Sequence, residues 1–293
     1  MGGVETRTPL RTLGLTAAAM TCFAANSLLC RAALGRGLTD APSFTSVRLL
    51  SGAIALGLLV RVSGRTTAGT RDLRAAASLF VYAIAFSLAY TRIPAALGAL
   101  LLFGAVQVTM VGRGIVGGER PGASEWAGIV LSLGGLVALT LPGLRQGDFG
   151  GSILMIGAGI AWGVYSLLGR SSRSDPLAAT AANFAYAAPL ALVSSLVAAG
   201  LGAPHLSAPH LSSAGLGLAV ASGALASGGG YAIWYAALRG LSTTRAGLVQ
   251  LSVPPLAALG GVVLLGEDVT LRLVLSAVAI LGGIALAVTS RRA

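Results

Sequence analysis

The sequence has few charged residues and no lysine at all. Charged residues make up 10% of its 293 positions, whereas a soluble domain usually carries about 25%. Hydrophobic residues make up 55%, so the charges are too few to cover a surface that faces water. This composition excludes an ordinary soluble domain. Because runs of about 20 apolar residues span a bilayer as helices, it predicts an all-α membrane protein; the alternating ten-residue segments of a β-barrel do not occur.

Residues that hold metals or perform catalysis are scarce as well. The two histidines, His205 and His210, belong to a repeated APHLS segment between apolar runs. The sequence contains no metal-ligand spacing, no Walker A motif and no nucleophile elbow. No Asp or Glu lies in the middle of an apolar run, so no carboxylate relay for protons is visible. We therefore expect no cofactor, no metal site, no catalytic residues and no enzymatic activity.

The cysteines and the basic residues both have structural interpretations. Cys22 and Cys30 lie on one apolar run, about 12 Å apart along a helix, which is too far for a disulfide. We interpret them as packing residues. The net charge of +11 comes from arginines that lie singly or in loose groups between apolar runs. This distribution is typical of loop charges that fix membrane topology, and we expect no nucleic-acid partner.

Ten apolar runs, separated by turn-forming or charged segments, are expected to be transmembrane helices. The first run follows Arg7 and Arg11, as in a signal peptide, but it is longer than the apolar part of such a peptide, so we expect a retained helix. The runs cover residues 12–34, 43–62, 75–91, 94–114, 124–142, 151–170, 177–199, 214–237, 243–265 and 269–289.

The chain also repeats itself, with offsets that drift between 135 and 148 residues. Gly118–Glu119 recurs as Gly266–Glu267, and SLLCR at 27–31 recurs as SLLGR at 166–170. The same alignment pairs Phe23 with Trp162, Thr45 with Thr180 and Arg48 with Asn183. We predict a duplication with halves 1–146 and 147–293.

Each half then holds five helices. Because five is odd, the second half inserts upside down relative to the first, and the two form an inverted repeat. The arginines indicate that both termini lie in the cytoplasm, because thirteen loop arginines then fall inside and five outside. The inside arginines are Arg7, Arg11, Arg61, Arg65, Arg71, Arg74, Arg113, Arg120, Arg170, Arg173, Arg239, Arg291 and Arg292. The outside arginines are Arg31, Arg36, Arg92, Arg145 and Arg272.

Several of these features together resemble a known family. Two five-helix halves, SVRLLSGA at 46–53 and the paired turns GER and GED are similar to the drug/metabolite transporter superfamily, EamA type. Within it, the chain resembles the YddG-type exporters of aromatic and other neutral amino acids. The resemblance implies a central cavity between the halves, formed mainly by helices 1, 3, 4, 6, 8 and 9, and outward transport by alternating access.

Aromatic residues in the middle of the spans are the first candidates for substrate binding, because inverted-repeat transporters bind substrates near the bilayer midplane. Tyr82 and Phe86 share one helix face, as do Trp162 and Tyr165. For Trp162 we favour a place in the cavity wall over packing, and for the pair Tyr82 and Phe86 both remain open. A further cluster of Tyr231, Trp234 and Tyr235 lies close to Arg239. For this cluster we favour the aromatic belt at the membrane interface.

Polar residues within the spans are the second set of candidates. Asn26, Gln107, Asn183 and Gln250 qualify. Gln250 precedes two prolines that break its helix and free backbone carbonyls, so it can bind substrate or bond to a neighbouring helix. Arg48 lies well inside the second span and can meet a carboxylate, but we favour a structural role. The predicted substrate-binding residues are Arg48, Tyr82, Phe86, Trp162, Tyr165, Asn183 and Gln250.

The functional expectation is an exporter of neutral amino acids of the aromatic, Met and Thr type in a bacterial inner membrane, working as a monomer on a small-molecule substrate. Export of another metabolite or drug is the alternative, and a structural subunit or membrane enzyme is an alternative of another class. Nucleotide-sugar-like anions fit less well, since Arg48 is the one basic residue well inside a span. The paired turns at Glu119 and Glu267 are expected to cap or bond adjoining helix ends, a structural role.

Overall fold

A computed structural model describes residues 9–67, 70–141, 148–200, 210–265 and 268–289, and in this part of the chain helices joined by turns are the only regular structure apart from one isolated β-bridge. Within it, ten helices are long and apolar enough to cross a membrane, so the predicted ten-span, all-α fold is confirmed. Eight spans are single helices: α1 (Pro9–Leu34), α2 (Ala41–Val62), α3 (Leu73–Tyr90), α4 (Ala95–Val116), α5 (Ala123–Thr140), α6 (Phe149–Ser171), α7 (Pro176–Gly200) and α12 (Leu271–Thr289).

The eighth and ninth spans are interrupted. The eighth runs through α8 (Ser213–Ala221), a π-helical segment η2 (Ser222–Gly229) and α9 (Gly230–Leu238). The ninth runs through α10 (Thr243–Val249), a 3₁₀ turn η3 (Gln250–Ser252) and α11 (Val253–Leu265). The second break lies where the sequence places Gln250 ahead of Pro254 and Pro255. Such irregular turns inside transmembrane helices are frequent at functional sites.

Short polar side chains define where several helices begin. Asp40, Asp72 and Asp148 each accept a hydrogen bond from backbone N–H groups in the first turn of α2, α3 and α6. Ser212 and Ser242 do the same for α8 and α10. These N–H groups have no partner within their own helix, so the caps satisfy them. The turn residues that mark the span boundaries in the sequence thus also fix the helix starts.

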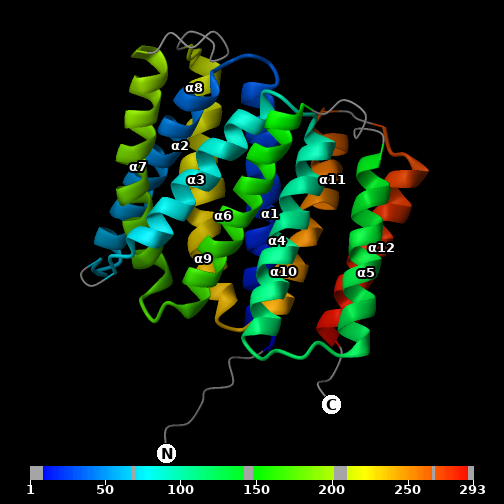
Figure 1. Ribbon diagram of the computed structural model, residues 1–293. Helices are drawn as coiled ribbons and strands as arrows, with labels where there is room; N and C mark the ends of the chain where they lie inside the picture. Colours follow the sequence, from blue (N-terminus) through cyan, green and yellow to red (C-terminus); the bar gives the residue numbers. More distant parts are fainter. Residues whose placement is uncertain (1–8, 68–69, 142–147, 201–209, 266–267, 290–293) are drawn as a thin grey trace, which may run out of the picture.

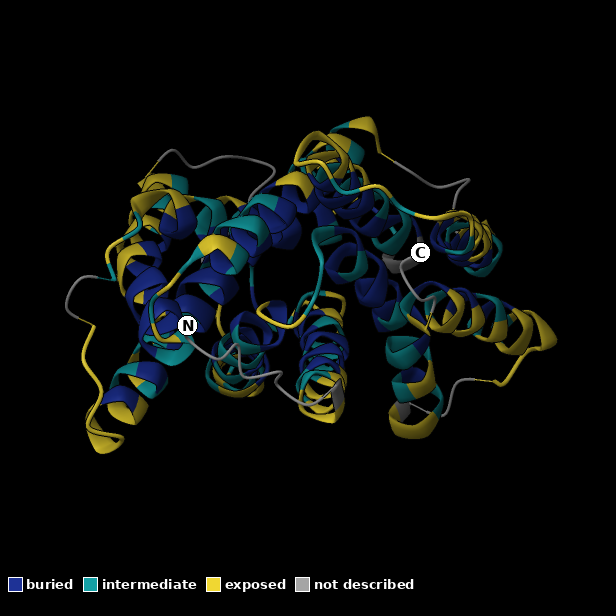
Figure 2. Ribbon diagram, turned by 90° about the horizontal axis from the view of Figure 1, so that it is seen from below, coloured by how far each residue is buried: buried dark blue, intermediate teal, exposed yellow. Residues whose placement is uncertain are grey.

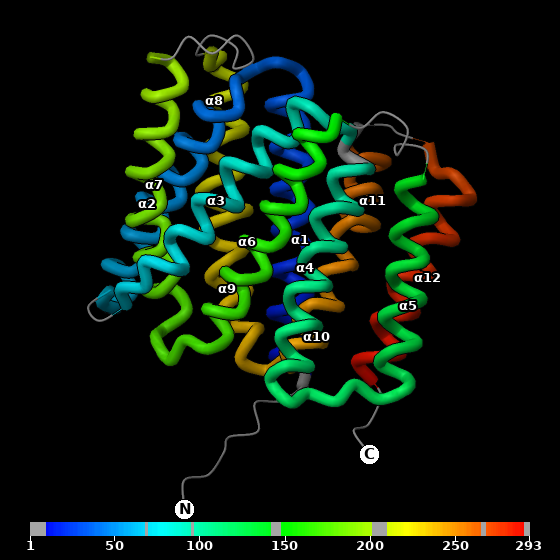
Figure 3. Tube along the Cα trace, viewed as in Figure 1, coloured from blue at the N-terminus to red at the C-terminus, as the bar shows by residue number. Residues whose placement is uncertain are grey.

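The helices pack so that distant parts of the chain lie side by side (Figures 1 and 3). On one side of the bundle α5 packs along α12, and on the opposite side α2 packs along α7. Between them α3 and α4 contact α6, while α9 and α11 contact α1. Exchanging the first five spans with the last five maps these contacts onto one another. This symmetry supports the proposed two-fold repeat, whose boundaries at residues 146 and 147 remain a prediction.

Glycines allow α2 to approach two of its neighbours, η2 and α7, closely. A Cβ placed on Gly223 of η2 would lie 2.1 Å from the carbonyl oxygen of Arg48 on α2, and one on Gly52 would lie 2.4 Å from the Phe184 ring. Close contact through small residues is a common way for membrane helices to associate. Seen along the bundle in Figure 2, the buried residues face inward and the exposed ones outward, and many of the exposed residues are large and apolar.

Candidate functional site

Aromatic side chains from four spans meet in the middle of the bundle. We call Phe23, Tyr82, Phe86, Trp162, Tyr165 and Tyr231 the aromatic box. The Trp162 ring is its hub: its centroid lies 4.7 Å from that of Tyr231, 4.9 Å from that of Tyr82 and 5.2 Å from that of Phe23. These are the separations of favourable tilted and edge-to-face ring pairs. Trp162 and Phe23, which the repeat alignment pairs, are thus in direct contact.

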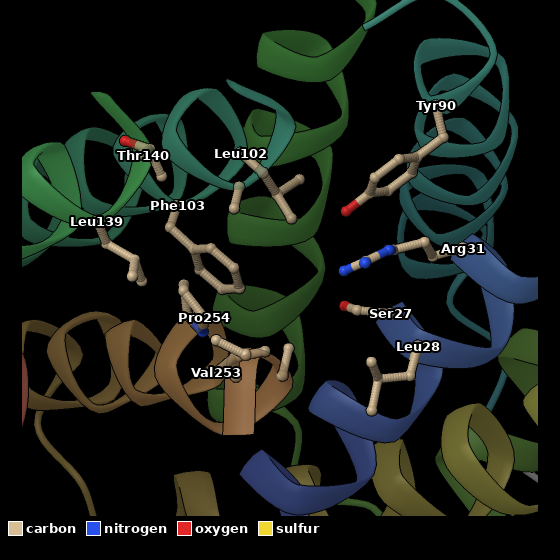
Figure 4. Close-up of a pocket in the computed structure, with 13 residues that line it drawn as sticks. Ser27, Leu28, Arg31, Tyr90, Leu102, Phe103, Leu139, Thr140, Val253 and Pro254 are labelled. Atoms are coloured by element: carbon tan, nitrogen blue, oxygen red, sulfur yellow. The ribbon is translucent and has the colours of Figure 1, made fainter. Parts of the chain in front are cut away.

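A small cavity lies within the aromatic box. Its volume is about 20 Å³, which is room for about one water molecule. Ser27, Leu102, Phe103 and Val253 line this cavity and also a neighbouring one of about 200 Å³. Figure 4 shows the larger cavity, which we call the vestibule, between the C-terminal part of α1 and the residues around Pro254. The box cavity therefore adjoins a wider space across a shared wall, and a ligand larger than water needs these side chains to move.

Arg31 and Tyr90 border the vestibule. In Figure 4 the Arg31 side chain extends from α1 between the hydroxyl groups of Tyr90 and Ser27. Leu139 and Thr140 of the fifth span lie on the opposite wall. The vestibule thus has a polar side and an apolar side, as do many small-molecule pockets.

Gln250 holds Trp162 in place. The indole Nε1 of Trp162 donates to Oε1 of Gln250 at 2.5 Å, and Nε2 of Gln250 donates to the carbonyl oxygen of Ala246 at 2.9 Å and contacts the sulfur of Met110 at 3.2 Å. Because the Trp N–H and both ends of the amide have partners, the pair satisfies its polar atoms inside an apolar core. The 3₁₀ turn that starts at Gln250 thereby fixes the orientation of the central ring.

Arg48 lies fully buried beside the box. Its Nε donates to Oγ of Ser227 at 2.8 Å and its Nη2 to the Tyr231 hydroxyl at 2.5 Å, while Nη1 has no hydrogen-bond partner among the described residues. The guanidinium carbon lies 5.5 Å from the centroid of the Tyr82 ring. All of these partners are uncharged. Burial of a cation without a counter-charge costs free energy. Arg48 is therefore a candidate partner for a negatively charged group of a ligand.

Asn183 lies outside this cavity wall. Its amide nitrogen donates to the hydroxyl of Tyr165 at 3.5 Å and to that of Tyr235 at 3.3 Å, and the Tyr235 hydroxyl donates to the backbone oxygen of Tyr165 at 3.2 Å. Asn183 is therefore placed behind Tyr165, where it steadies the wall of the box from α7. It does not line the box cavity or the vestibule. Of the predicted set, Tyr82, Phe86 and Trp162 line the box cavity directly.

The expectation that Tyr231, Trp234 and Tyr235 form an interfacial belt was wrong. Their exposed fractions are 1%, 0% and 3%. Tyr231 lines the cavity within the box, and the Trp234 indole donates to Oγ of Ser166 at 3.1 Å. The eighth span turns this cluster toward α1 and α6. Closeness in sequence to Arg239 indicates how deep these rings lie, but it does not indicate which way they face.

Glu119 links the two halves at the other end of the bundle. Its Oε1 accepts from the backbone N–H of Thr243 at 2.7 Å, and its Oε2 accepts from the N–H and the hydroxyl of Thr244 at 2.9 and 2.8 Å. Nη2 of Arg170 lies 3.8 Å from Oε1 of Glu119. We call this arrangement the Glu119 clamp. The carboxylate caps α10 in the second half, as expected for a helix-end role, whereas Glu267, for which the same role is predicted, lies outside the described residues.

The clamp favours the ionised carboxylate. Partial burial opposes the charge, but the donors at Thr243 and Thr244 outweigh it and lower the pKa of Glu119 from 4.5 to about 2. The hollow next to the clamp, of about 700 Å³, includes Thr16 and Val249 and shares no lining residue with the box cavity. The box cavity thus shares a wall with the vestibule and none with the hollow beside the clamp.

Comparisons with known proteins agree with this architecture. The chain is 51% identical over 282 residues, 96% of each chain, to the protein named "Uncharacterized protein PA1977" of Pseudomonas aeruginosa strain PAO1. It is similar in fold to a solved structure titled "Crystal structure of protein", with a TM-score of 0.74, 20% identity and coverage of 93% of this chain and 98% of the other. Residues 149–289 match the EamA-like transporter family. The second half of the chain therefore matches the EamA-like transporter family.

The ten spans, together with the match of the second half to this family, make the protein a multi-pass membrane protein. Sequence reasoning missed several residues at the centre of the bundle. Phe23 was used only to align the repeat, although its pairing with Trp162 already indicated an equivalent position. Asn26 was noted as a polar residue within a span, but its place in the cavity wall was not predicted. Phe103 carried no signal beyond its hydrophobicity.

Proposed function

We propose that this EamA-like transporter exports neutral amino acids of the aromatic, methionine and threonine type. The observation that carries the proposal is the aromatic box, which offers rings for an apolar side chain and whose Tyr231 is hydrogen-bonded to a buried cation, Arg48. Rings with polar hydroxyl groups suit a ligand that has an apolar body and charged ends. Sites for larger anions usually need several basic groups, and Arg48 is fully buried without a second basic residue among its described partners.

The proposed mechanism is alternating access. The mechanism is supported by the place of the box cavity, which shares a wall with the vestibule at the C-terminal end of α1 and none with the hollow beside the Glu119 clamp. With the N-terminus in the cytoplasm, the vestibule faces outward and the clamp faces the cytoplasm. Release of the clamp, together with closure of the vestibule, would then expose the box to the cytoplasm. We propose that the transporter works as a monomer in a bacterial inner membrane.

Flux through the purified protein tests the proposal. We expect reconstituted liposomes to exchange labelled phenylalanine, methionine or threonine at rates well above those of protein-free liposomes. Repeating the measurement with and without a proton or sodium gradient shows whether an ion is coupled. A competition panel with other metabolites and drugs defines the substrate class. If none of the three amino acids crosses the membrane faster than in protein-free liposomes, the proposal is wrong.

The proposed orientation makes a separate prediction. A reporter tag inserted next to Gly118 should lie in the cytoplasm, and a tag inserted next to Asp268 should lie on the opposite side, because the two turns are equivalent in inverted halves. Accessibility of each tag to a membrane-impermeant label on intact cells measures the side. Two tags on the same side would contradict the inverted repeat, and two tags with exchanged sides would contradict only the cytoplasmic N-terminus.

A further inference from the structure

The unpaired donors around Arg48 point to the part of the substrate that the box recognises. Arginine is always charged and can only donate hydrogen bonds. The Tyr231 oxygen therefore accepts from Nη2 of Arg48, and the Tyr231 hydroxyl proton is left to donate to the Tyr82 oxygen, which lies 3.4 Å away. Tyr82 in turn keeps one hydroxyl proton that has no acceptor among the described residues. This sequence of donors ends at a residue that lines the box cavity.

The surroundings give this chain of donors a direction. At its start, Nε of Arg48 donates to Ser227, whose hydroxyl donates to Oδ1 of Asn26 at 3.2 Å. Asn26 Oδ1 also accepts from Ser222 at 2.7 Å. These partners orient the guanidinium but are all uncharged. The positive charge is therefore compensated by no carboxylate among its described contacts, and it polarises Tyr231 and Tyr82 as donors toward the cavity.

An anionic group is the ligand that completes this arrangement. It would accept the free proton of Tyr82. Arg48 does not itself line the cavity, but its Nη1 is buried without a described partner, so its charge acts on the anion through the two tyrosines. A charge-assisted hydrogen bond is roughly twice as strong as a neutral one, and a buried cation gains most from an anion that reaches it. The rings of Trp162 and Phe23 enclose the rest of the cavity, which suits an apolar group. The cavity holds about 20 Å³, so the side chains around it must move apart to admit such a ligand.

We propose that Arg48, Tyr231 and Tyr82 form a relay of donors that binds the carboxylate of the transported molecule, with Tyr82 as the contacting group. The inference rests on the proposed function, because it assumes that the aromatic box holds the substrate. It goes further because it assigns the carboxylate, and not the ammonium group, as the part of the substrate that the protein recognises. The ring of the substrate then lies on the Trp162 side of the box.

Three ligands that share one ring separate these groups. Phenylalanine has both charged ends, phenylalaninamide lacks the carboxylate, and 3-phenylpropionate lacks the ammonium group. Binding of each to the full-length protein in detergent is measured by isothermal titration calorimetry. We expect the amide to bind at least about tenfold more weakly than phenylalanine, since it loses a charge-assisted interaction. We expect 3-phenylpropionate to retain most of the affinity.

Variants then locate the effect. Tyr82→Phe keeps the ring and removes only the terminal proton, and we expect it to reduce the difference between phenylalanine and the amide to less than about threefold, since the discriminating hydrogen bond is gone. Arg48→Met should do the same. Tyr186→Phe removes a hydroxyl from a ring that is 42% exposed on α7 and should leave the difference unchanged. Arg48→Met can unfold the protein, so the thermal unfolding of each variant is measured as a control. If Arg48→Met is unfolded, the result for Tyr82→Phe alone decides the outcome.

The outcomes distinguish this inference from the proposed function. Equal binding of phenylalanine and its amide, a difference that persists in Tyr82→Phe, or binding of neither carboxylate overturns the relay. If 3-phenylpropionate binds in a Tyr82-dependent way while no amino acid crosses liposomes, the relay stands and amino acid export fails. If amino acids are transported without dependence on Tyr82, export stands and the relay fails.

Discussion

Replacing Trp162 by alanine should lower amino acid exchange in liposomes by more than about tenfold, the equivalent of losing at least 1.4 kcal/mol of interaction with the transported molecule. The ring is in contact with Tyr82, Tyr231 and Phe23 and lines the box cavity. The substitution removes the central ring of the box. It also leaves Oε1 of Gln250 without its hydrogen-bond donor, the indole Nε1 at 2.5 Å. The expected defect is in flux, measured with labelled phenylalanine.

Two further variants show whether the loss arises at the site. Trp162→Phe keeps an aromatic ring but lacks the N–H, so we expect partial flux and a smaller loss of stability than in the alanine variant, because large-to-small core changes leave a cavity. Trp126→Ala removes an indole that is 44% exposed on α5, and flux should stay within about twofold of the unmodified protein, since exposed substitutions are usually mild. Equal losses in Trp162→Ala and Trp126→Ala would show a general effect of tryptophan removal and would refute the central role of the box.

Replacing Glu119 by alanine should open the end of the molecule that the clamp closes. The change removes the acceptor of three hydrogen bonds from Thr243 and Thr244 and the partner of Arg170. Hydrogen bonds to charged groups contribute about 1.5–3 kcal/mol each, so the balance between closed and open forms should shift by about tenfold or more. A cysteine placed at Met20, which is buried one helical turn deeper than Thr16, should then react faster with a membrane-impermeant thiol reagent. Cys22 and Cys30 are first replaced by alanine.

A matched variant and the pH dependence control this experiment. Asp72→Asn weakens a cap that acts within its own helix, through N–H groups of Arg74 and Ala75, and should not change the labelling rate at position 20. The clamp lowers the pKa of Glu119 to about 2, so its contribution is complete above the ordinary value of 4.5 and is lost as the pH falls from there toward 2. The thiolate fraction itself falls with pH, so each rate is divided by that of a reference cysteine on an exposed loop at the same pH. We expect this ratio to be constant between pH 5 and 8 and to rise below about 4.5. A rate unaffected by Glu119→Ala would show that the clamp does not hold this end closed.

Much of the fold could be predicted from the sequence because transmembrane helices are determined locally. Apolar length sets each span, and residues such as Asp40 and Asp148 set where a helix begins. The break before Pro254 was equally visible, since proline removes a helical hydrogen bond wherever it stands. The π-helical segment at Ser222–Gly229 carried no comparable signal. An apolar run with small residues such as Gly and Ser looks the same whether it forms an α-helix or a π-helix.

The candidate site was less predictable, because it depends on which helix faces meet. Trp162 and Tyr82 were selected for their depth in the membrane, and the structure places both at the box cavity. Asn183 has the same depth and polarity but bonds to Tyr165 and Tyr235 behind the wall. Tyr231 looked interfacial and lies in the box instead. Depth follows from position along one helix, whereas orientation follows from packing against other helices.

By itself, the sequence of this protein determined a ten-span membrane fold, its broad family resemblance and the presence of one buried arginine. Only the tertiary structure decided that Arg48 from the second span meets Tyr231 from the eighth, that Gln250 orients Trp162, and that Glu119 of one half caps a helix of the other. The physical reason is the range of the forces involved. Burial of apolar length acts on each helix separately, while hydrogen bonds inside an apolar bundle need partners that folding brings together from distant parts of the chain.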